Sequence, residues 1–249
     1  MNENLRIVPY REQPELADQL ASLEAESFPK FIEEDAVWAE VSPHFYDEFG
    51  DFQSFMVDDS NGALVAALNN VPFNWDGNPD HLPGYHDMLQ GAVKDWQAGK
   101  KPNTLSGVQM IVSPDYRAQG VPELMVGETD RMIKENGITS LMVAVRPTLK
   151  EKYPLVPIEE YAGWKRDDGL PFDPWLRSMA RMGMQYFSPA PESTVIEDTV
   201  AKWEEWTGME FPVSGEYWLP GGLSTLLIDV ENDNGRHCEP HVWYGVLYE

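Results

Sequence analysis

The chain is poor in cysteine, in basic side chains and in long apolar runs, and each of these shortages excludes a structural feature or a class of partner. Its single cysteine, Cys238, excludes an internal disulfide and fits a reducing compartment. The longest aliphatic run, near Leu141, falls far short of the ~18 residues that a membrane-spanning helix needs. The first three residues, Met1-Asn2-Glu3, lack the basic start of an export signal, so we expect a cytoplasmic protein.

Basic residues are not only few but unevenly placed. The 249-residue chain has 18 Lys and Arg against 42 Asp and Glu, a formal net charge of −24. Residues 1–100 hold 5 basic and 19 acidic side chains and residues 190–249 hold 2 and 12, whereas residues 101–189 hold 11 of each. Because such an acidic chain repels nucleic acids and anionic membranes, we expect neither as a partner. Residues 101–189, the middle of the chain, carry no net charge, so a polyanionic ligand meets the least repulsion there.

One segment in that middle has the pattern of a strand, a tight turn, a helix and a second strand. Alternating apolar residues predict a strand over residues 108–112, and Pro114 ends it because proline has no N–H to donate. From Pro122 apolar residues recur at helical spacing, and Gly137 supplies the left-handed residue that closes such a helix. Residues 141–145 are short and wholly apolar, which is typical of an interior strand.

The turn before this helix is suited to an anion. The first N–H groups of a helix have no partner within it and carry partial positive charge, so a phosphate docks there. The turn, Arg117-Ala-Gln-Gly120-Val-Pro122, resembles motif A of the GNAT superfamily of acyl-CoA-dependent N-acyltransferases. Arg117 and Gly120 match the first two fixed positions of that motif. Pro122 departs from the third, which is glycine or alanine, and removes one amide donor while keeping a φ that suits a helix start.

The resemblance implies a GNAT-like α/β (α+β) fold, a mixed and mostly antiparallel twisted sheet flanked by helices. It also implies that acetyl-CoA or another acyl-CoA binds as co-substrate along the first strand and over the turn, with backbone amides of that strand stabilising the oxyanion. The expected coenzyme-binding residues are Met110, Ile111, Val112, Arg117, Ala118, Gln119, Gly120, Val121 and Pro122.

Weaker signals extend the resemblance from residue 5 to residue 187. Local patterns predict strands over residues 5–8, 52–57, 63–68 and 185–187, a helix over residues 14–24, and a helix that Asp173 caps with Pro174 at its first position. We expect a GNAT-like acyl-CoA-binding core over residues 1–188. A C-terminal extension, residues 189–249, is expected to pack on the same sheet as part of one structural domain.

Residues 147–172 form a long insertion in this core, and their prolines preclude a long continuous helix. Two interpretations remain open, a lid beside the coenzyme and a surface loop with an aromatic anchor, of which the second is the commoner. The stretches Arg146–Lys150 and Asp168–Arg177 resemble parts of an uncharacterised bacterial GNAT-like subgroup. That likeness names no substrate.

The residues that catalyse acyl transfer in relatives are absent here. In many GNAT enzymes a tyrosine four residues before the helix-ending glycine is the general acid, and Met179 stands at that position. Several members carry a carboxylate on the motif A strand as general base, whereas this strand has Ser106 and Gln109. The catalytic residues therefore stay unassigned. Five side chains remain as candidates to replace the general acid or the general base, although the sequence spacing supports none of them. They are Tyr153, Tyr161, Glu33, Glu34 and Asp47.

The C-terminal third has one dense cluster, His237-Cys238-Glu239-Pro240-His241. Four of these residues are metal-ligand types, but neighbours in an extended segment point to alternate faces and no second cluster lies near, so we predict a turn at a strand entry and no metal. Cys238 beside an acidic residue is expected to be an inert thiol. Further patterns predict strands over residues 223–229 and 242–248 and a short helix around Trp203-Glu-Glu-Trp206.

Two functions follow from these observations. The favoured one is an acyl-CoA-dependent N-acyltransferase that acts on an amine of a small molecule or a protein, and the acidic flanks favour a cationic acceptor. The alternative is a non-catalytic GNAT-fold protein that binds CoA or another ligand as a sensor or interaction module. A homo-oligomer is compatible with either.

Overall fold

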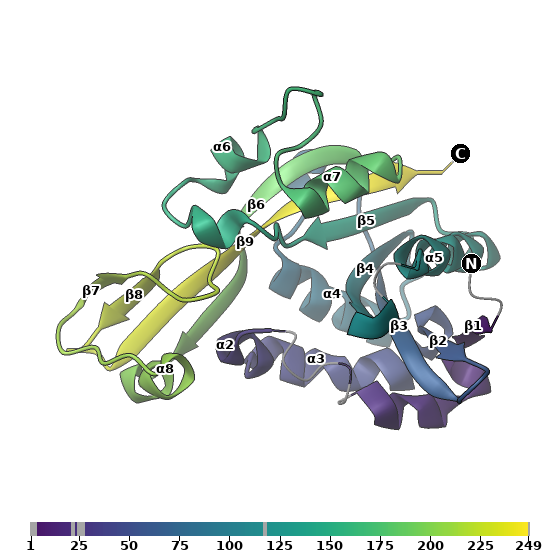
Figure 1. Cartoon of the computed structure of the whole chain (residues 1–249), viewed down its shortest axis with the longest axis horizontal. Helices are drawn as coiled ribbons and strands as arrows, with labels where there is room; N and C mark the ends of the chain where they lie inside the picture. Colours follow the sequence, from purple (N-terminus) through teal and green to yellow (C-terminus); the bar gives the residue numbers. More distant parts are fainter. Residues whose placement is uncertain (1–3, 21–22, 24–27, 117–118, 249) are drawn as a thin grey trace.

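The computed structural model describes residues 4–248 except residues 21–22, 24–27 and 117–118. In this part of the chain a nine-stranded sheet has the spatial order β1-β2-β3-β4-β5-β9-β8-β7, and β6 pairs with β9 as well (Figure 1). The strands are β1 (Leu5–Pro9), β2 (Ser54–Asp58), β3 (Ala63–Phe73), β4 (Thr104–Val112), β5 (Ser140–Val145), β6 (Gln185–Asp198), β7 (Gly215–Tyr217), β8 (Leu226–Asp229) and β9 (Asn234–Leu247). Since every pair except β4–β5 is antiparallel, the predicted mixed sheet is confirmed.

Helices cover both faces of this sheet. The α-helices are α2 (Lys30–Glu33), α3 (Ala36–Asp47), α4 (Tyr85–Gln97), α5 (Val121–Asn136), α6 (Ile158–Ala162), α7 (Pro174–Arg181) and α8 (Val200–Thr207). Short 3₁₀ turns lie at Tyr10–Glu12, Pro14–Gln19, Gly50–Phe52, Pro79–His81, Pro114–Tyr116 and Lys150–Lys152. In the described part of the chain, no helix is long and apolar enough to cross a membrane.

The strand–turn–helix–strand pattern is confirmed as β4, α5 and β5. Gly120 precedes α5 with φ 75° and Gly137 follows it with φ 64°, both in the left-handed region that glycine adopts without strain. On the neighbouring strand β3, Ala66 and Leu68 pack toward α5, while Ala67 packs with Leu16 and Leu20 on the opposite face. The period of two in the sequence thus places α5 on one face of the sheet.

The two parallel strands of this unit separate soon after they meet. Pairing between β4 and β5 is confined to Thr104–Ser106 and Ser140–Met142, after which the strands diverge. A register shift in the β3–β4 pair leaves Val108 without a partner, and such a bulge bends the strand that carries it. Within the described residues, no strand pairs with the facing edges of β4 and β5 beyond this point.

Three local predictions were wrong in extent or type. Residues 14–19 of the predicted helix form a 3₁₀ turn, although Leu16 and Leu20 still reach the apolar cluster under β2 and β3; residues 21–22 and 24 lie outside the described residues. The strand predicted from Phe52 begins at Ser54, because Phe52 closes a 3₁₀ turn. Strand β4 begins at Thr104, four residues before the alternating pattern.

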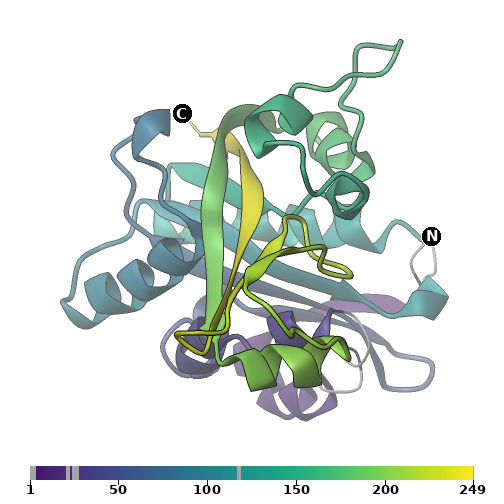
Figure 2. The same ribbon diagram turned by 90° about the vertical axis from the view of Figure 1, so that its left-hand side faces the viewer.

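The largest difference lies in β6 and β9, which are 14 residues long each and run side by side (Figure 2). Sequence patterns predict only their ends, since Pro189, Pro191 and Pro240 argue against strand interiors. Register shifts at Tyr186/Ser188 and Ala190/Thr194 accommodate the prolines of β6. The segment 237–241 therefore lies inside β9, and the predicted turn there is wrong.

Candidate functional site

A cavity of about 680 Å³ opens where β4 and β5 diverge. Residues 107–110 of β4 and 143–146 at the end of β5 form two of its walls. Pro122, Val126 and Thr129 of α5 line it on one side. From the α3–α4 side it is lined by Asp35, Trp38 and Tyr85. Helix α5 and the α3–α4 pair lie on opposite sides of the sheet (Figure 1). Residues from both sides line the cavity, which therefore lies in the gap between the diverging strands.

The residues predicted to bind the coenzyme fall into four groups. Met110 and Pro122 line the cavity, whereas Ile111 and Val121 are buried in the protein core. Val112, Gln119 and Gly120 lie next to these along the chain. Arg117 and Ala118 lie outside the described residues.

The start of α5 combines features that favour and oppose an anion. The backbone at Gly120 is open, since the nearest atom to a Cβ there is a carboxylate oxygen of Glu123 at 4.0 Å. Helix geometry leaves the first N–H groups free, but Pro122 has none to offer. The carboxylate of Glu123 places negative charge in the first turn, which stabilises the helix but repels a phosphate.

The wall that α7 contributes is apolar. Met179, Met182, Met184 and Trp175 line the cavity there. The position predicted to hold a general acid therefore does face the cavity, but the thioether of Met179 has no proton to donate.

Of the five side chains considered as replacements, Glu33 is the one that lines the cavity within the described residues. Tyr161 donates to Asp173 at 2.9 Å inside an aromatic cluster of the insertion, where Tyr153 also packs. Glu34 pairs with Lys30 at 2.7 Å, and Asp47 lies in the last turn of α3 away from the cavity lining.

Tyr85, which sequence analysis did not single out, lies at the first position of α4 and faces the cavity. Its hydroxyl donates to the backbone oxygen of Val108, the bulged residue of β4, at 3.2 Å. Its ring stacks on that of His241 with centroids 5.4 Å apart and planes within 14°. Burial raises the pKa of Tyr85 well above its ordinary value, so the phenol stays protonated.

A break in strand pairing exposes the middle of β9 to the same cavity. Along one edge, β9 pairs with β5 through residues 242–247 and with β8 through residues 234–237. Residues 238–241 lie between these partners, and on this stretch Glu239 and His241 share one face because strand side chains alternate. Arg146, which directly follows β5, lies at the same break.

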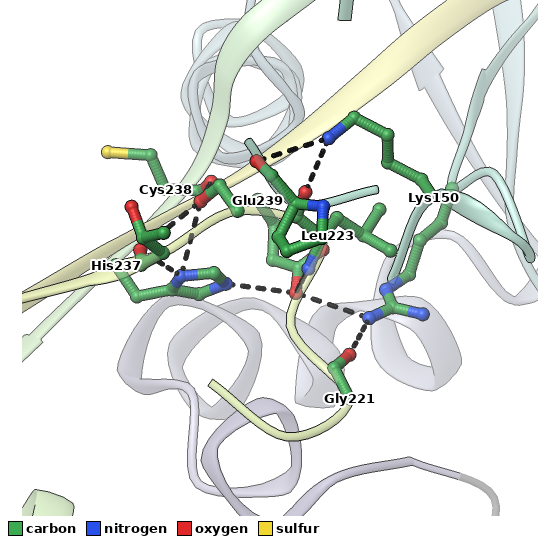
Figure 3. Close-up of polar contacts among 10 residues, drawn as sticks. Lys150, Gly221, Leu223, His237, Cys238 and Glu239 are labelled. Carbon is green, nitrogen blue, oxygen red and sulfur yellow. Dashed lines mark hydrogen bonds and ion pairs between the residues drawn. The ribbon is translucent and has the colours of Figure 1, made fainter. Parts of the chain in front are cut away.

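Glu239 is fully buried at the centre of a charged network (Figure 3). Its Oε1 lies 3.2 Å from Nη2 of Arg146, 3.0 Å from Nε2 of His237 and 3.2 Å from the backbone nitrogen of Leu223. Burial alone would raise the pKa of Glu239, but the Arg146 charge and the hydrogen bond with His237 lower it to about 2. The carboxylate is therefore ionised at neutral pH.

His241 is 7% exposed, and burial lowers its pKa to about 4 against the opposing charge of Glu239, with Arg146 adding to the decrease. The ring is therefore neutral at pH 7. Its Nδ1 is buried and has no hydrogen-bond partner among the described residues.

Unpartnered buried polar atoms concentrate around this cavity. Across the described residues there are seven such side-chain atoms, and four belong to residues of the cavity lining. These four are Asn70 Oδ1, Arg146 Nε, Glu239 Oε2 and His241 Nδ1. Because each unmade buried hydrogen bond costs about 1–3 kcal/mol, their accumulation marks a site arranged for a ligand rather than for stability.

The insertion meets this network through Lys150, whose side chain is 1% exposed. Its Nζ donates to the backbone oxygens of Tyr153 at 2.9 Å and Leu223 at 2.7 Å (Figure 3), and burial lowers its pKa to about 8. The insertion also has an aromatic cluster, formed by Tyr153, Tyr161, Trp164 and Phe172. Among the described residues of the insertion 147–172, Thr148 is the one that lines the cavity. This arrangement favours a loop with an aromatic anchor over a lid.

Cys238 points to the other face of β9 from Glu239 and is half-buried, and burial raises the pKa of its thiol, as expected of an inert cysteine. In the part of the chain that the structure describes, no three His, Cys, Asp or Glu side chains are placed to hold a metal ion.

Two residues predicted to bind the coenzyme, Met110 and Pro122, line the cavity, whereas sequence analysis assigned none of Tyr85, Arg146, Glu239 and His241 to this site. The period-two spacing of His237, Glu239 and His241 was visible and was weighed only as a metal motif. Arg146 directly after an apolar strand was a second available signal. Neither pattern indicates that α4 brings Tyr85 to the same place.

Comparison with known proteins supports the same fold. No family model matches the sequence. The arginine N-acetyltransferase avaD of Aspergillus versicolor is 29% identical over 207 residues, which span 75% of this chain and 71% of that protein.

Two solved structures resemble the chain along nearly its whole length. The loading GNATL domain of CurA from Lyngbya majuscula has a TM-score of 0.57 at 15% identity, with 98% of this chain and 96% of that domain covered. The GphF GNAT-like decarboxylase in complex with isobutyryl-CoA has a TM-score of 0.57 at 18% identity, with 98% of each chain covered. At these identities the likeness concerns the fold.

Proposed function

Because this chain has the fold of the GNAT superfamily, we propose that it is an acyl-CoA-dependent N-acetyltransferase whose acceptor is a small cationic amine. The observation that carries the proposal is the cavity that crosses the sheet between β4 and β5 and has chemically different ends. Its α5–α7 side is apolar and reaches the start of α5, whereas its α2–α4 side carries Glu33, Asp35 and Glu239.

The coenzyme is assigned to the α5 side. Met110 and Pro122 would contact it within the cavity. Ile111 and Val112 are assigned to the coenzyme by the resemblance to motif A. The turn from Arg117 through Ala118, Gln119, Gly120 and Val121 would hold its phosphates, by the resemblance to motif A. When bound, the coenzyme supplies the thioester whose acyl carbon the amine attacks.

The acceptor is assigned to the acidic side. The carboxylate of Glu239 stays ionised and its Oε2 has no partner among the described residues, so a cationic group there gains a charge-assisted hydrogen bond. The relative from Aspergillus versicolor is named for arginine, which is a cation of this kind. Tyr85, bound to the bulge of β4, stands between the two sides of the cavity.

A thiol-release assay tests this function. Purified protein is incubated with acetyl-CoA and arginine, agmatine, an arginine with its carboxylate blocked, lysine, spermidine or a lysine-containing peptide, and free CoA thiol is measured. We expect release with at least one guanidinium compound and a lower rate with uncharged amines. An absence of release with every amine, including with longer acyl-CoAs, contradicts the proposal.

The second candidate is a GNAT-fold protein that binds CoA without turnover. The specific observation in its favour is Met179, which occupies the general-acid position and cannot donate a proton. Saturable CoA binding by calorimetry, together with no thiol release from any acyl-CoA, would favour this second function.

A further inference from the structure

The acidic side of the cavity contains a neutral side chain, His241, whose buried Nδ1 has no hydrogen-bond partner among the described residues. We propose that His241 accepts the proton released by the attacking amine, and that Glu239 and Tyr85 hold its ring in position. This inference rests on the proposed N-acetyltransferase activity and names the proton acceptor that the motif A strand lacks.

The position of His241 follows from the break in the pairing of β9. Its neighbour Val242 is opposite Val145, the last residue of β5, so the ring lies where the wall of the cavity passes from β5 to β9. On its other side the ring is stacked on Tyr85, which is anchored to the bulge of β4. The imidazole is thus held between the two diverging strands.

The two buried carboxylates of the cavity lining, Asp35 and Glu239, are already paired. Asp35 caps α3 through the backbone nitrogen of Val37 at 3.1 Å and lies 2.7 Å from Nε2 of His86. Glu239 is held as a weak base by Arg146 and His237, and Glu33 is an exposed residue at the end of α2.

Tyr85 keeps its proton, because burial raises its pKa. By contrast, Nδ1 of His241 has no partner within the described residues and is free to take a proton.

The charges around His241 come from three elements. Glu239 on β9 favours the protonated ring, while Arg146 after β5 and His86 on α4 disfavour it together with burial, so the pKa is lowered to about 4. Such a ring is neutral at pH 7 and accepts a proton only from a nitrogen that has become acidic. An amine nitrogen becomes acidic as its lone pair is shared with the acyl carbon.

The proton balance needs no further reactant. The neutral form of the amine forms the N–C bond with the acyl carbon, and the C–S bond of the thioester breaks. The surplus proton of the nitrogen goes to Nδ1 of His241, and the protonated ring then passes a proton to the leaving sulfur, directly or through water, which returns His241 to its neutral form. The net change is one proton moved from nitrogen to sulfur, with nothing oxidised or reduced.

The test compares His241→Gln and His241→Ala with the unaltered protein and with His81→Gln, the same change at an exposed histidine of the Pro79–His81 turn. We expect His241→Gln to lower kcat by about 100-fold or more, in the range that general-base catalysis contributes, with KM for acetyl-CoA changed less than about threefold. His81→Gln should retain full activity.

Rescue separates proton transfer from a structural role. Added imidazole should restore the kcat of His241→Ala by about tenfold or more, since an external base fills the vacated space. A second readout is pH: the rate of the unaltered protein, divided by the fraction of the acceptor in its neutral form, should fall as the pH drops through about 4 and protonates His241, and this limb should be absent in His241→Gln.

The results of these experiments distinguish a failure of the role of His241 from a failure of the proposed function. Turnover that His241→Gln leaves unchanged, or a loss that imidazole does not restore while the variant remains folded by circular dichroism, overturns the role of His241 and leaves the proposed function standing. Absence of turnover in the unaltered protein overturns both.

Discussion

At the scale of single residues, the site differs from the rest of the interior in how its polar atoms are satisfied. Elsewhere among the described residues three buried side-chain atoms have no partner, on Ser54, Ser106 and Trp206, while others are paired, as Gln53 is with the backbone of Phe49 and Asn70 at 2.8 Å each. Around the cavity, Glu239 and His241 each keep one polar atom without a partner among the described residues. Such atoms reduce stability unless a ligand satisfies them, which is why they point to function.

Glu239 gives the first prediction at this scale. Its folded-state pKa lies near 2, below the ordinary value of 4.5, so its contribution to stability is present above pH 4.5 and is lost as the pH falls through about 2. A shift of this size corresponds to about 3 kcal/mol. Glu239→Gln should therefore be less stable than the unaltered protein at pH 7, and the difference should shrink between pH 4.5 and pH 2.

Urea unfolding at a series of pH values measures this difference. Glu210→Gln, at an exposed position, is the matched control and should differ little from the unaltered protein at any pH. A stability difference for Glu239→Gln that stays constant with pH would show that the carboxylate charge plays no part in the network.

At the scale of elements, periodicity was a good guide wherever one face of an element is buried and the other is not. The apolar stripe of α5 and the run in β5 predicted both elements, with ends set by Gly120, Gly137 and the register of Ser140. The same reasoning failed for β6 and β9, because their prolines argue locally against strands. Long-range pairing of these strands with each other outweighs that local preference.

Pro122 allows a prediction at the element scale. Proline at the second position of α5 removes an N–H that would face a bound phosphate, so Pro122→Ala should restore one donor. If the proposed coenzyme site is correct, affinity for CoA should rise by about tenfold or more, as expected of one hydrogen bond to a charged group, which contributes about 1.5–3 kcal/mol.

Calorimetry with CoA measures this change. Pro14→Ala, also at the start of a helical turn but on the far side of β2, is the matched control and should leave CoA affinity unchanged. Equal CoA affinity of Pro122→Ala and the unaltered protein would place the phosphates away from the start of α5.

At the scale of the whole molecule, charge and cavity act together. If the proposed function is correct, the net charge of −24 repels the polyanionic coenzyme and attracts the cationic acceptor, which the proposal assigns to opposite sides of the cavity. Salt screens both effects, since the Debye length is about 10 Å at 0.1 M ionic strength.

The two substrates should therefore respond to salt in opposite directions. Raising NaCl from about 20 to about 200 mM is expected to increase kcat/KM for acetyl-CoA and to decrease kcat/KM for the cationic acceptor, each several-fold. Steady-state kinetics at constant pH measure both, and an uncharged osmolyte at equal osmolarity is the control. A parallel response of the two parameters would contradict charge steering.

Local sequence was sufficient for the strand–turn–helix–strand unit around Gly120, for the cap of α7 at Asp173 and for the acidic character of the chain, because each depends on neighbouring residues or on composition alone. The far side of the cavity was not predictable in this way. Tyr85, Arg146 and His241 come from separate parts of the chain. They meet only because β5 and β8 leave the middle of β9 unpaired on one edge, which is a property of strand pairing over long distances in the sequence.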